Sequence, residues 1–268
     1  MGSRRFAATA AAVLVLLTGC TGTASSESPP ERTALSGPLT VEVLNTYPHD
    51  MNAFTQGLEL RDGWLYESTG QYGTSDVRKV NYESGEVVSL VPLPDDAFGE
   101  GLTIVGDQMW QLTWRERYAI RRDLETLEEV DRVEYQGEGW GICHDASGER
   151  LVMSNGSARL TFRDPETFEE IGSVTVTRDG EPLTMLNELE CVDGQVWANV
   201  WQTDEIVLID PANGQVRAVV DASGLLSESE RAVADVLNGI AALPDSDTFL
   251  ITGKLWPTVF HVRFVPAE

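Results

Sequence analysis

Short apolar segments separated by turn residues follow one another along most of the chain. Typical segments are "GWLYESTG", "DQMWQLTW" and "GQVWANVW", which open on Gly or Asp and are rich in aromatic and β-branched residues. Runs of this length and composition between turn signals predict β-strands rather than helices. A single stretch, "SESERAVADVLN", suggests a short helical turn. The pattern therefore predicts an all-β fold.

One short phrase recurs five times at the start of these strand groups. The segments "FTQGLEL", "FGEGLTI", "GWGICHD", "LNELECV" and "LNGIAAL" share a variable residue followed by Gly or Glu and then Leu or Ile. The variable positions are Gln56, Glu100, Trp140, Asn187 and Asn238. Because they lie about 40 to 50 residues apart, they indicate a repeat architecture.

Each repeat contains four predicted strands. The third and fourth are joined by a recurring turn, seen in "NYESGEV", "DLETLEE", "DPETFEE" and "DPANGQV". The last repeat has three strands, and a spare strand, "LTVEVLNTY" (39–47), precedes the first repeat. Four strands in about 45 residues are typical of a β-propeller blade. The sequence thus predicts a five-bladed β-propeller of four-stranded blades, with the last blade closed by the N-terminal strand.

This architecture brings two sets of side chains to one mouth of the central channel. First strands line the channel, and the end of each antiparallel second strand lies beside the start of the first. The second strands end at Gly70, Trp114, Gly156, Trp201 and Lys254. We therefore expect three tryptophans, one acid, one base and three amides around a pocket that suits a small ligand. These residues are Gln56, Glu100, Trp140, Asn187, Asn238, Trp114, Trp201 and Lys254.

The spacing leaves the roles of these residues open. Glu100 either forms a salt bridge with Lys254 that closes the channel, or acts as a general acid/base whose pKa is raised by partial desolvation. Trp64, Trp110 and Trp197 lie in mid-strand, where we expect packing roles. Asn238 is expected to satisfy backbone groups. Hydrolysis, group transfer and plain ligand binding all remain compatible with the pocket.

The first 20 residues resemble an export signal. "MGSRRFAATAAAVLVLLTGC" has two arginines, an apolar run too short to span a membrane, and a lipobox-like end at Cys20. We expect residues 1–20 to be a lipoprotein signal peptide and Cys20 to be lipidated, the alternative being an ordinary secretion signal. Residues 21–38 are expected to form a flexible tether and 39–268 the folded five-bladed propeller domain. The general secretory route is favoured over the twin-arginine route. Export followed by lipidation would place the protein on the outer face of the cell membrane.

Charge and cysteines exclude some functions. The formal charge of −24 argues against nucleic acid as a partner. No His or Cys lies near Cys143 and Cys191 at zinc-ligand spacing, so no metal site is expected. We expect a disulfide between these two residues, which lie on first strands of consecutive blades in an exported protein. Cys143 lies three residues after Trp140, whereas Cys191 lies four residues after Asn187, so alternation along the strands would point the two side chains to different faces. The alternative is therefore two separate buried thiols, unless a bulge at "NELEC" restores the geometry.

An ordered set of motifs adds a family resemblance. The motifs, spread from about Val41 to Phe264, are "FTQGLEL", "FGEGLT", "QLTWRER", "GWGICHD", "LNELECVDGQVWANVW", "TDEIVLIDP", "VLNGIAAL" and "ITGKLWPTVF". Together they resemble the plant-type glutaminyl-peptide cyclotransferases, which also occur in bacteria and are unrelated to the zinc-dependent animal enzymes. The resemblance implies a five-bladed propeller that converts N-terminal glutamine to pyroglutamate and releases ammonia.

The resemblance also implies roles for individual residues. Glu100 would be the catalytic acid/base, and Asn187 and Lys254 would assist the reaction by stabilising the oxyanion. The implied substrate-binding residues are Gln56, Phe54, Phe98, Trp114, Trp140 and Trp201. The implied partners are peptides or proteins with N-terminal glutamine, and the enzyme is expected to be a monomer that needs no cofactor, although a structural calcium ion in the channel is left open. The alternative is a non-catalytic propeller that binds peptides or small ligands at the same mouth.

Overall fold

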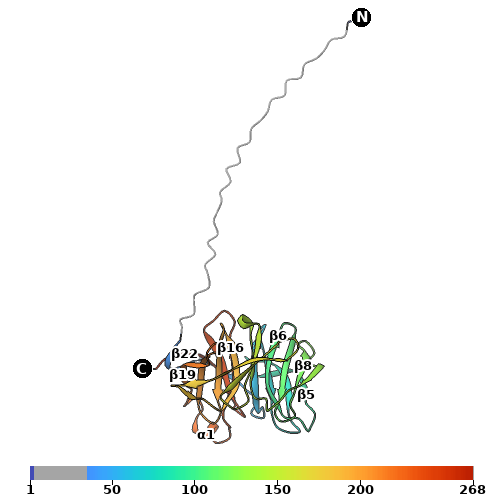
Figure 1. Cartoon of the computed structure of the whole chain (residues 1–268). Coiled ribbons are helices and arrows are strands. Elements are labelled where there is room, and N and C mark those ends of the chain that lie inside the picture. The colour runs from blue at the N-terminus through green and yellow to red at the C-terminus, as the bar shows by residue number, and fades with distance from the viewer. Residues whose placement is uncertain (3–34, 268) are drawn as a thin grey trace. The chain divides into compact units, whose positions relative to one another are not determined.

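The computed structural model describes residues 1–2 and 35–267 (Figure 1). The predicted signal peptide, Cys20 and most of the predicted tether lie outside the described residues. Within the compact unit Arg32–Glu268, the described residues form β-strands with two short helical segments, so the fold is all-β as predicted. The helical segments are η1 (Ala146–Gly148) and α1 (Glu228–Arg231), and the latter lies where a helical turn was expected and begins with a capping box between Ser227 and Glu230.

Three sheets each contain four antiparallel strands in chain order. The first consists of β2 (Thr55–Arg61), β3 (Trp64–Thr69), β4 (Asp76–Asn81) and β5 (Glu86–Pro92). The second consists of β6 (Gly99–Val105), β7 (Gln108–Thr113), β8 (Tyr118–Asp123) and β9 (Glu129–Glu134). The third consists of β10 (Ile142–Asp145), β11 (Arg150–Met153), β12 (Arg159–Arg163) and β13 (Glu170–Thr175).

The fourth sheet has ten strands and contains both chain ends of the folded unit. One half consists of β16 (Leu186–Val192), β17 (Gln195–Val200), β18 (Glu205–Asp210) and β19 (Gln215–Asp221), with the small hairpin β14 (Thr177–Arg178) and β15 (Glu181–Pro182) beside it. The other half consists of β20 (Leu237–Ala242), β21 (Thr248–Gly253), β22 (Thr258–Pro266) and β1 (Gly37–Pro48). Strand β1 pairs antiparallel with β22, so the N-terminal strand does join the last strand of the chain.

The repeat pattern did not predict that these two halves would be joined. Strand β1 also pairs in parallel with β19, matching Gly37–Thr40 to Ala218–Asp221. With 12 residues, β1 is longer than the outer strand β5 with seven, and its first residues reach the edge of β19. An edge strand otherwise presents unpaired backbone groups to solvent, and this pairing covers part of that edge.

The recurring turn between third and fourth strands has one physical cause. In each copy, the side chain of the first Asn or Asp accepts hydrogen bonds from backbone N–H groups two or three residues later. These residues are Asn81, Asp123, Asp164 and Asp210. Side chains of this length can imitate a backbone turn, which explains why the motif is repeated while its other residues vary.

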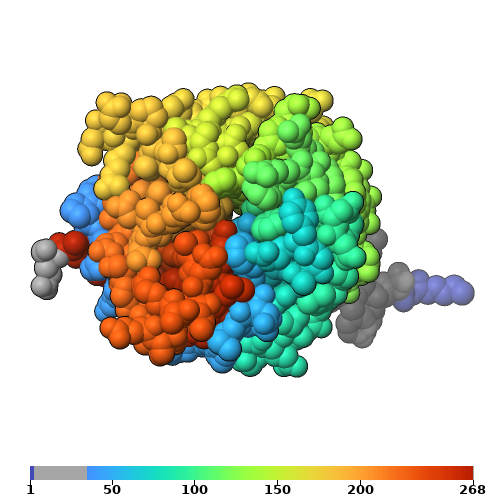
Figure 2. Space-filling view, turned by 90° about the horizontal axis from the view of Figure 1, so that it is seen from below, coloured from blue at the N-terminus to red at the C-terminus, as the bar shows by residue number. Residues whose placement is uncertain are grey.

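The first strands of the strand groups contact one another in a closed order. Strand β2 contacts β6, β6 contacts β10, β10 contacts β16, β16 contacts β20, and β20 contacts β2. Figure 2 shows the chain progressing around the face of the molecule, from cyan through green and yellow to orange. The apolar core lies between neighbouring groups; for example, Trp110 and Leu112 of β7 pack with Ile142 of β10 and Leu151 of β11.

Close approach of these first strands explains the glycine in the repeated phrase. A Cβ atom at Gly101 would lie 2.8 Å from the Gly141 Cα and the Ile142 N of the next strand. Gly57 and Gly141 likewise face the backbone of the following first strand, and Gly239 has a φ of 122°. The fourth copy has Glu188 in place of glycine, and its carboxylate accepts hydrogen bonds from the backbone of β2 and β20.

We expect Gly101→Ala to lower the free energy of unfolding by about 1–3 kcal/mol or more, because the added methyl group meets backbone atoms that cannot rotate away. Denaturant unfolding of the purified variant measures this change. Gly172→Ala in β13 is the matched control, because its Cβ would meet a single atom, Phe162 Cδ2, at 3.4 Å. Equal unfolding midpoints for the two variants would show that the strands do not need this close approach.

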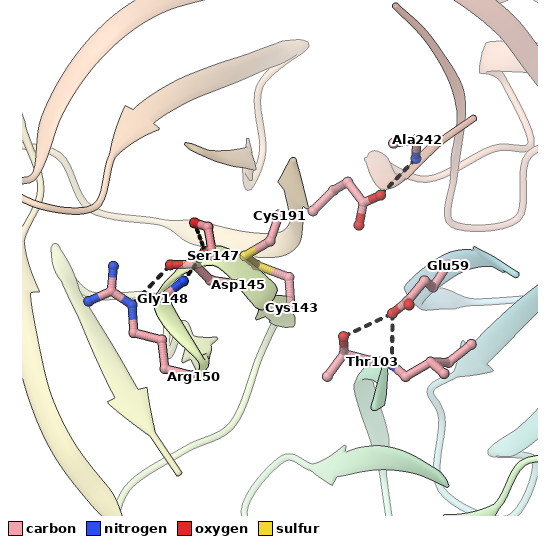
Figure 3. Close-up of a disulfide and its surroundings, with 11 residues drawn as sticks. Glu59, Thr103, Cys143, Asp145, Ser147, Gly148, Arg150, Cys191 and Ala242 are labelled. Atoms are coloured by element: carbon pink, nitrogen blue, oxygen red, sulfur yellow. Dashed lines mark hydrogen bonds and ion pairs between the residues drawn. A yellow bond between two sulfur atoms is a disulfide. The ribbon is translucent and has the colours of Figure 1, made fainter. Parts of the chain in front are cut away.

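The predicted disulfide is present. Cys143 of β10 and Cys191 of β16 are bonded, with their Cα atoms 5.4 Å apart (Figure 3). The strand alternation that favoured two separate thiols does not apply, because β16 has a bulge between Leu186 and Leu189. After the bulge, side chains no longer alternate between the two faces in the order counted from Asn187. The bridge spans 48 residues, for which chain entropy gives a stabilisation of about 4 kcal/mol.

Two carboxyl groups near the disulfide, the partly buried Glu59 and the buried Glu190, connect first strands by hydrogen bonds. Glu59 accepts hydrogen bonds from the Thr103 hydroxyl and the Ile104 N–H on β6, and Glu190 accepts one from the Ala242 N–H on β20. Burial raises the pKa of Glu59 to about 7 and that of Glu190 well above its ordinary value. Figure 3 shows Glu59 and Thr103 facing each other across neighbouring strands.

Candidate active site

The variable residues of the repeated phrase lie at equivalent positions. Gln56, Glu100, Asn187 and Asn238 are each the second residue of a first strand, and Trp140 precedes β10 by two residues. In β2, β6, β16 and β20 the register shifts at this position, which marks a β-bulge. Bulges re-aim side chains and are frequent next to active sites.

The residues predicted at the ends of the second strands also share one position relative to their strands. Trp114, Trp201 and Lys254 each come directly after the last residue of a second strand. In the other two groups, Gly70 comes directly after β3 and Gly156 follows β11 by three residues, and a Cβ atom there would collide with Phe98 and with Trp140, respectively. Gly70 therefore leaves room for an aromatic side chain of the next repeat, and Gly156 for one of its own repeat.

Glu100 is a buried carboxyl group, with 4 % of its surface exposed. Its Oε2 atom has no hydrogen-bond partner among the described residues, and no ion pair within 4.0 Å is formed with Lys254 there. Burial raises the pKa of Glu100 well above its ordinary 4.5; Lys254 opposes this rise, and the charges of Glu138 and Glu116 add to it. A group with a pKa shifted in this way is suited to proton transfer near neutral pH.

Lys254 is the positive charge that faces Glu100. It is also 4 % exposed, and its Nζ lies 4.7 Å from the centre of the Phe54 ring. Burial lowers the pKa of Lys254, while Glu100 and Asp235 oppose the shift. The Lys254 side chain is therefore buried and not a solvated surface charge.

Three amide side chains lie buried near the bulges. Asn238 donates from Nδ2 to the Thr55 carbonyl at 2.9 Å and to Gln56 Oε1 at 3.3 Å, which is the backbone-satisfying role expected for it. Among the described residues, the Oδ1 atoms of Asn187 and Asn238 have no partner. Because buried polar atoms are normally paired, such atoms beside an unpartnered carboxylate indicate a place where a polar ligand binds.

The predicted aromatic residues pack in two groups, which together make up the aromatic wall of the site. Phe54 contacts Phe98 with ring centres 6.1 Å apart, and Phe98 contacts Trp114 at 5.5 Å. Trp140 and Trp201 pack edge to face at 5.5 Å. The mid-strand residues Trp110 and Trp197 are instead buried in the core.

Four residues of this region were not singled out from the sequence. Glu138 accepts hydrogen bonds from the indole N–H groups of Trp114 and Trp140, and Arg115 stacks on Trp114. Glu116 accepts hydrogen bonds from Tyr72 and from the Phe98 backbone. These residues are Tyr72, Arg115, Glu116 and Glu138. A signal was available for three of them, since they lie within two residues of Trp114 or Trp140 in "TWRE" and "GEGW".

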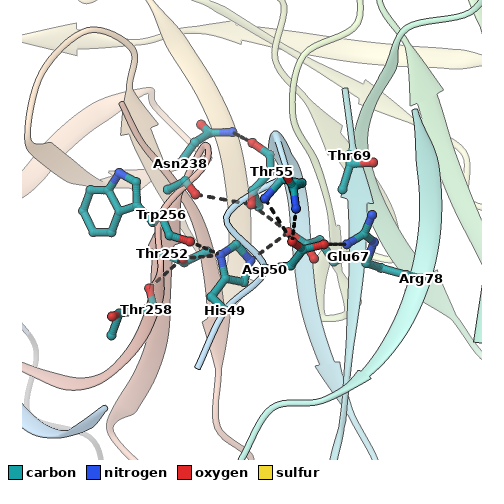
Figure 4. A network of polar contacts seen from close by, with 12 residues as sticks. His49, Asp50, Thr55, Glu67, Thr69, Arg78, Asn238, Thr252, Trp256 and Thr258 are labelled. Atoms are coloured by element: carbon teal, nitrogen blue, oxygen red, sulfur yellow. Dashed lines mark hydrogen bonds and ion pairs between the residues drawn. The ribbon is translucent and has the colours of Figure 1, made fainter. Parts of the chain in front are cut away.

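A buried polar network supports the strand that carries Gln56 (Figure 4). Glu67 accepts a hydrogen bond from the Thr55 hydroxyl at 2.7 Å and pairs with His49 Nε2 at 3.1 Å. His49 Nδ1 lies 2.8 Å from the Trp256 carbonyl. Burial alone would lower the pKa of His49, but Glu67 outweighs it and raises the pKa above its ordinary 6.5. His49 thus connects Glu67 of β3 to Trp256, in the segment after Lys254.

Within residues 1–2 and 35–267, no group of three or more His, Cys, Asp or Glu side chains could hold a metal ion. In the same part of the chain, no helix is long and apolar enough to cross a membrane. The Glu100 carboxyl group, the Lys254 ammonium group, the amides unpartnered among the described residues and the aromatic wall can together bind a small polar group and move a proton.

Comparisons with known proteins agree with this arrangement. The chain matches the family described as glutamine cyclotransferase over residues 11–264. It is 39 % identical to the glutaminyl-peptide cyclotransferase of Arabidopsis thaliana over 234 residues, which cover 85 % of this chain and 72 % of the plant protein.

A solved structure is also similar. The crystal structure of Myxococcus xanthus glutaminyl cyclase superimposes with a TM-score of 0.79 and 37 % sequence identity, covering 87 % of this chain and 100 % of that one. On these matches, the chain belongs to the glutamine cyclotransferase family.

Proposed function

We propose that this protein is a glutaminyl-peptide cyclotransferase, which converts the N-terminal glutamine of peptides or proteins to pyroglutamate and releases ammonia. The observation that carries the proposal is the buried, unpartnered Glu100 carboxyl group facing Lys254 at one end of the first strands. Family membership and the 39 % identity to the plant enzyme support the same reaction.

The reaction needs one proton to be moved. The neutral α-amine of the substrate attacks its own γ-amide carbon, a new C–N bond forms, and the amide nitrogen leaves as ammonia. Glu100, in its ionised form, accepts the proton from the attacking amine and returns it to the departing nitrogen. Because the attack is intramolecular, holding the side chain folded back supplies much of the acceleration.

The other residues have roles that follow from their chemistry. Lys254 and Asn187 stabilise the negative charge that develops on the amide oxygen. Gln56 binds the polar part of the substrate, while Phe54, Phe98, Trp114, Trp140 and Trp201 exclude water and hold the folded-back side chain.

We also propose a five-bladed β-propeller as the finer description of the fold. The closed contact order of β2, β6, β10, β16 and β20 supports five blades around a channel. The antiparallel run of β20, β21, β22 and β1 supports a last blade completed by the N-terminal strand, with the β1–β19 pairing as a link to the preceding blade.

Ammonia release from a peptide with N-terminal glutamine tests the proposed activity. We expect stoichiometric release with the free peptide and none with the same peptide acetylated at its amine, since the acetylated nitrogen cannot attack. Tight binding of the free peptide without ammonia release would instead support the non-catalytic, ligand-binding alternative.

We propose that catalysis requires no metal ion, which the chemistry of the site supports because a carboxylate and an ammonium group suffice. Activity is therefore expected to survive extended treatment with EDTA, measured as kcat on the same peptide. Activity lost with EDTA and restored by zinc would contradict this. Loss restored by calcium, with a lowered unfolding temperature, would identify a structural calcium ion.

For the cellular context, we propose an exported monomer held on the outer face of the cell membrane by a lipid on Cys20, with no role for nucleic acid. The lipobox-like "LTGC", the charge of −24 and a disulfide suited to an oxidising compartment support this. Mass spectrometry of the mature protein from its host would detect the lipidated N-terminal cysteine.

A further inference from the structure

One carboxylate outside the predicted set contacts two tryptophans of the wall. Glu138 lies between β9 and β10, and its Oε2 accepts hydrogen bonds from Trp114 Nε1 at 2.9 Å and from Trp140 Nε1 at 3.2 Å. Its other oxygen, Oε1, accepts a hydrogen bond from Arg115 Nε at 3.1 Å. Both carboxylate oxygens are therefore used within the rim of the site.

These contacts fix the orientation of both indole rings. An indole has a single N–H donor, so binding it to a fixed acceptor determines how the ring is rotated. Trp114 follows β7 of the second sheet and Trp140 precedes β10 of the third, so one carboxylate joins walls contributed by two sheets. Hydrogen bonds to a charged acceptor are also stronger than neutral ones.

Neighbouring contacts extend this arrangement along the wall. The Arg115 guanidinium lies 3.7 Å from the centre of the Trp114 ring while it donates to Glu138. Trp114 then packs on Phe98, and Trp140 packs on Trp201. A change at Glu138 is expected to reach four of the aromatic residues that would enclose the substrate.

Glu138 also acts on Glu100 through its charge. The charged groups that face Glu100 are Lys254, which favours its ionised form, and Glu138 and Glu116, which disfavour it. The charge of Glu100 also contributes to raising the pKa of two nearby phenols, Tyr72 and Tyr135. Removing the Glu138 charge makes ionisation of Glu100 easier.

We propose that Glu138 is a positioning residue for glutamine cyclisation: it locks Trp114 and Trp140 into one wall of the site and adds a negative charge beside the catalytic carboxyl group. This role rests on the proposed function. Glu138 itself does not need to touch the reacting atoms, and its effect passes through the two tryptophans and Glu100.

Two substitutions separate the hydrogen bonds from the charge. Glu138→Gln keeps a carbonyl oxygen that can accept from an indole N–H but removes the charge, whereas Glu138→Ala removes both. Glu134→Gln is the matched control, because Glu134 is an exposed carboxylate at the end of β9, four residues away.

We expect Glu138→Ala to lower kcat/KM for a peptide with N-terminal glutamine by about 10²-fold, which is the scale of a misplaced binding wall. Glu138→Gln should recover part of this loss, and only Glu138→Ala should shift the tryptophan fluorescence spectrum. In both variants the acid limb of the rate profile should move to lower pH, because the pKa of Glu100 falls when a nearby negative charge is removed. Glu134→Gln should leave all three measurements unchanged.

The outcomes distinguish this role from the proposed function itself. A wild-type enzyme that releases no ammonia would overturn the proposed function and, with it, this role. If the wild type is active, wild-type kcat/KM and an unmoved acid limb in Glu138→Gln and Glu138→Ala would overturn the positioning role alone. If Glu138→Ala does not fold, the acid limb of the rate profile of Glu138→Gln still tests the positioning role.

Discussion

Glu100→Gln is expected to lower kcat for ammonia release by about 10²–10⁴-fold, the usual contribution of a general acid/base. Glutamine has nearly the same shape as glutamate but cannot accept and return a proton. Because Glu100 Oε2 has no hydrogen-bond partner among the described residues, the substitution breaks no contact at that atom. The unfolding temperature should therefore stay near that of the wild type, and its measurement separates lost chemistry from lost fold.

Glu59→Gln provides the control for this experiment. It makes the same change at a partly buried carboxyl group on another first strand, one that binds the Ile104 backbone instead of facing Lys254. It should keep wild-type kcat. Near-wild-type turnover by Glu100→Gln would remove Glu100 from the mechanism.

The second large effect is expected for Lys254→Met, which should lower kcat by about 10²–10³-fold, as the loss of one oxyanion-stabilising donor does in other enzymes. Methionine fills a similar volume without the charge. The acid limb of the rate profile should also move to higher pH, since Lys254 is the group that lowers the pKa of Glu100. This shift is opposite to the one expected for Glu138→Gln.

Lys79→Met serves as its control, because Lys79 lies against the rings of Trp64 and Tyr66, away from Glu100. It should change neither kcat nor the acid limb. If Lys254→Met retained wild-type kcat with an unmoved limb, Lys254 would have neither the oxyanion role nor an influence on Glu100.

Much of this fold could be predicted from the sequence because its signals are local. The strand lengths, the turns capped by residues such as Asn81 and Asp123, and the repeated phrase each depend on a few neighbouring residues. The parallel pairing of β1 with β19 could not be predicted in this way. It depends on how far the N-terminal strand extends past its partner, which is a property of the assembled sheet.

Part of the candidate site could also be predicted from the sequence. Repeat alignment predicts that Glu100 and Lys254 lie around one mouth of the channel, because equivalent positions in the strands lie at the same end of the strand groups. It missed Glu138, which lies in a connection that the repeat does not constrain. Its importance depends on two indole N–H groups that converge on it, and such convergence needs coordinates. The bulge that allows the Cys143–Cys191 bond could likewise be suspected but not placed from spacing alone.

The most direct test of the account is the ratio of the wild-type kcat/KM to the Glu100→Gln kcat/KM, measured for one N-terminal glutamine peptide across pH. Because kcat/KM reports the free enzyme and the free substrate, ionisation of the substrate amine affects both enzymes equally and cancels in the ratio. We expect a constant, large ratio at high pH that falls as Glu100 becomes protonated, at a pH well above its ordinary pKa of 4.5, because burial raises that pKa. A ratio near one at every pH would contradict the claim that Glu100 transfers the proton.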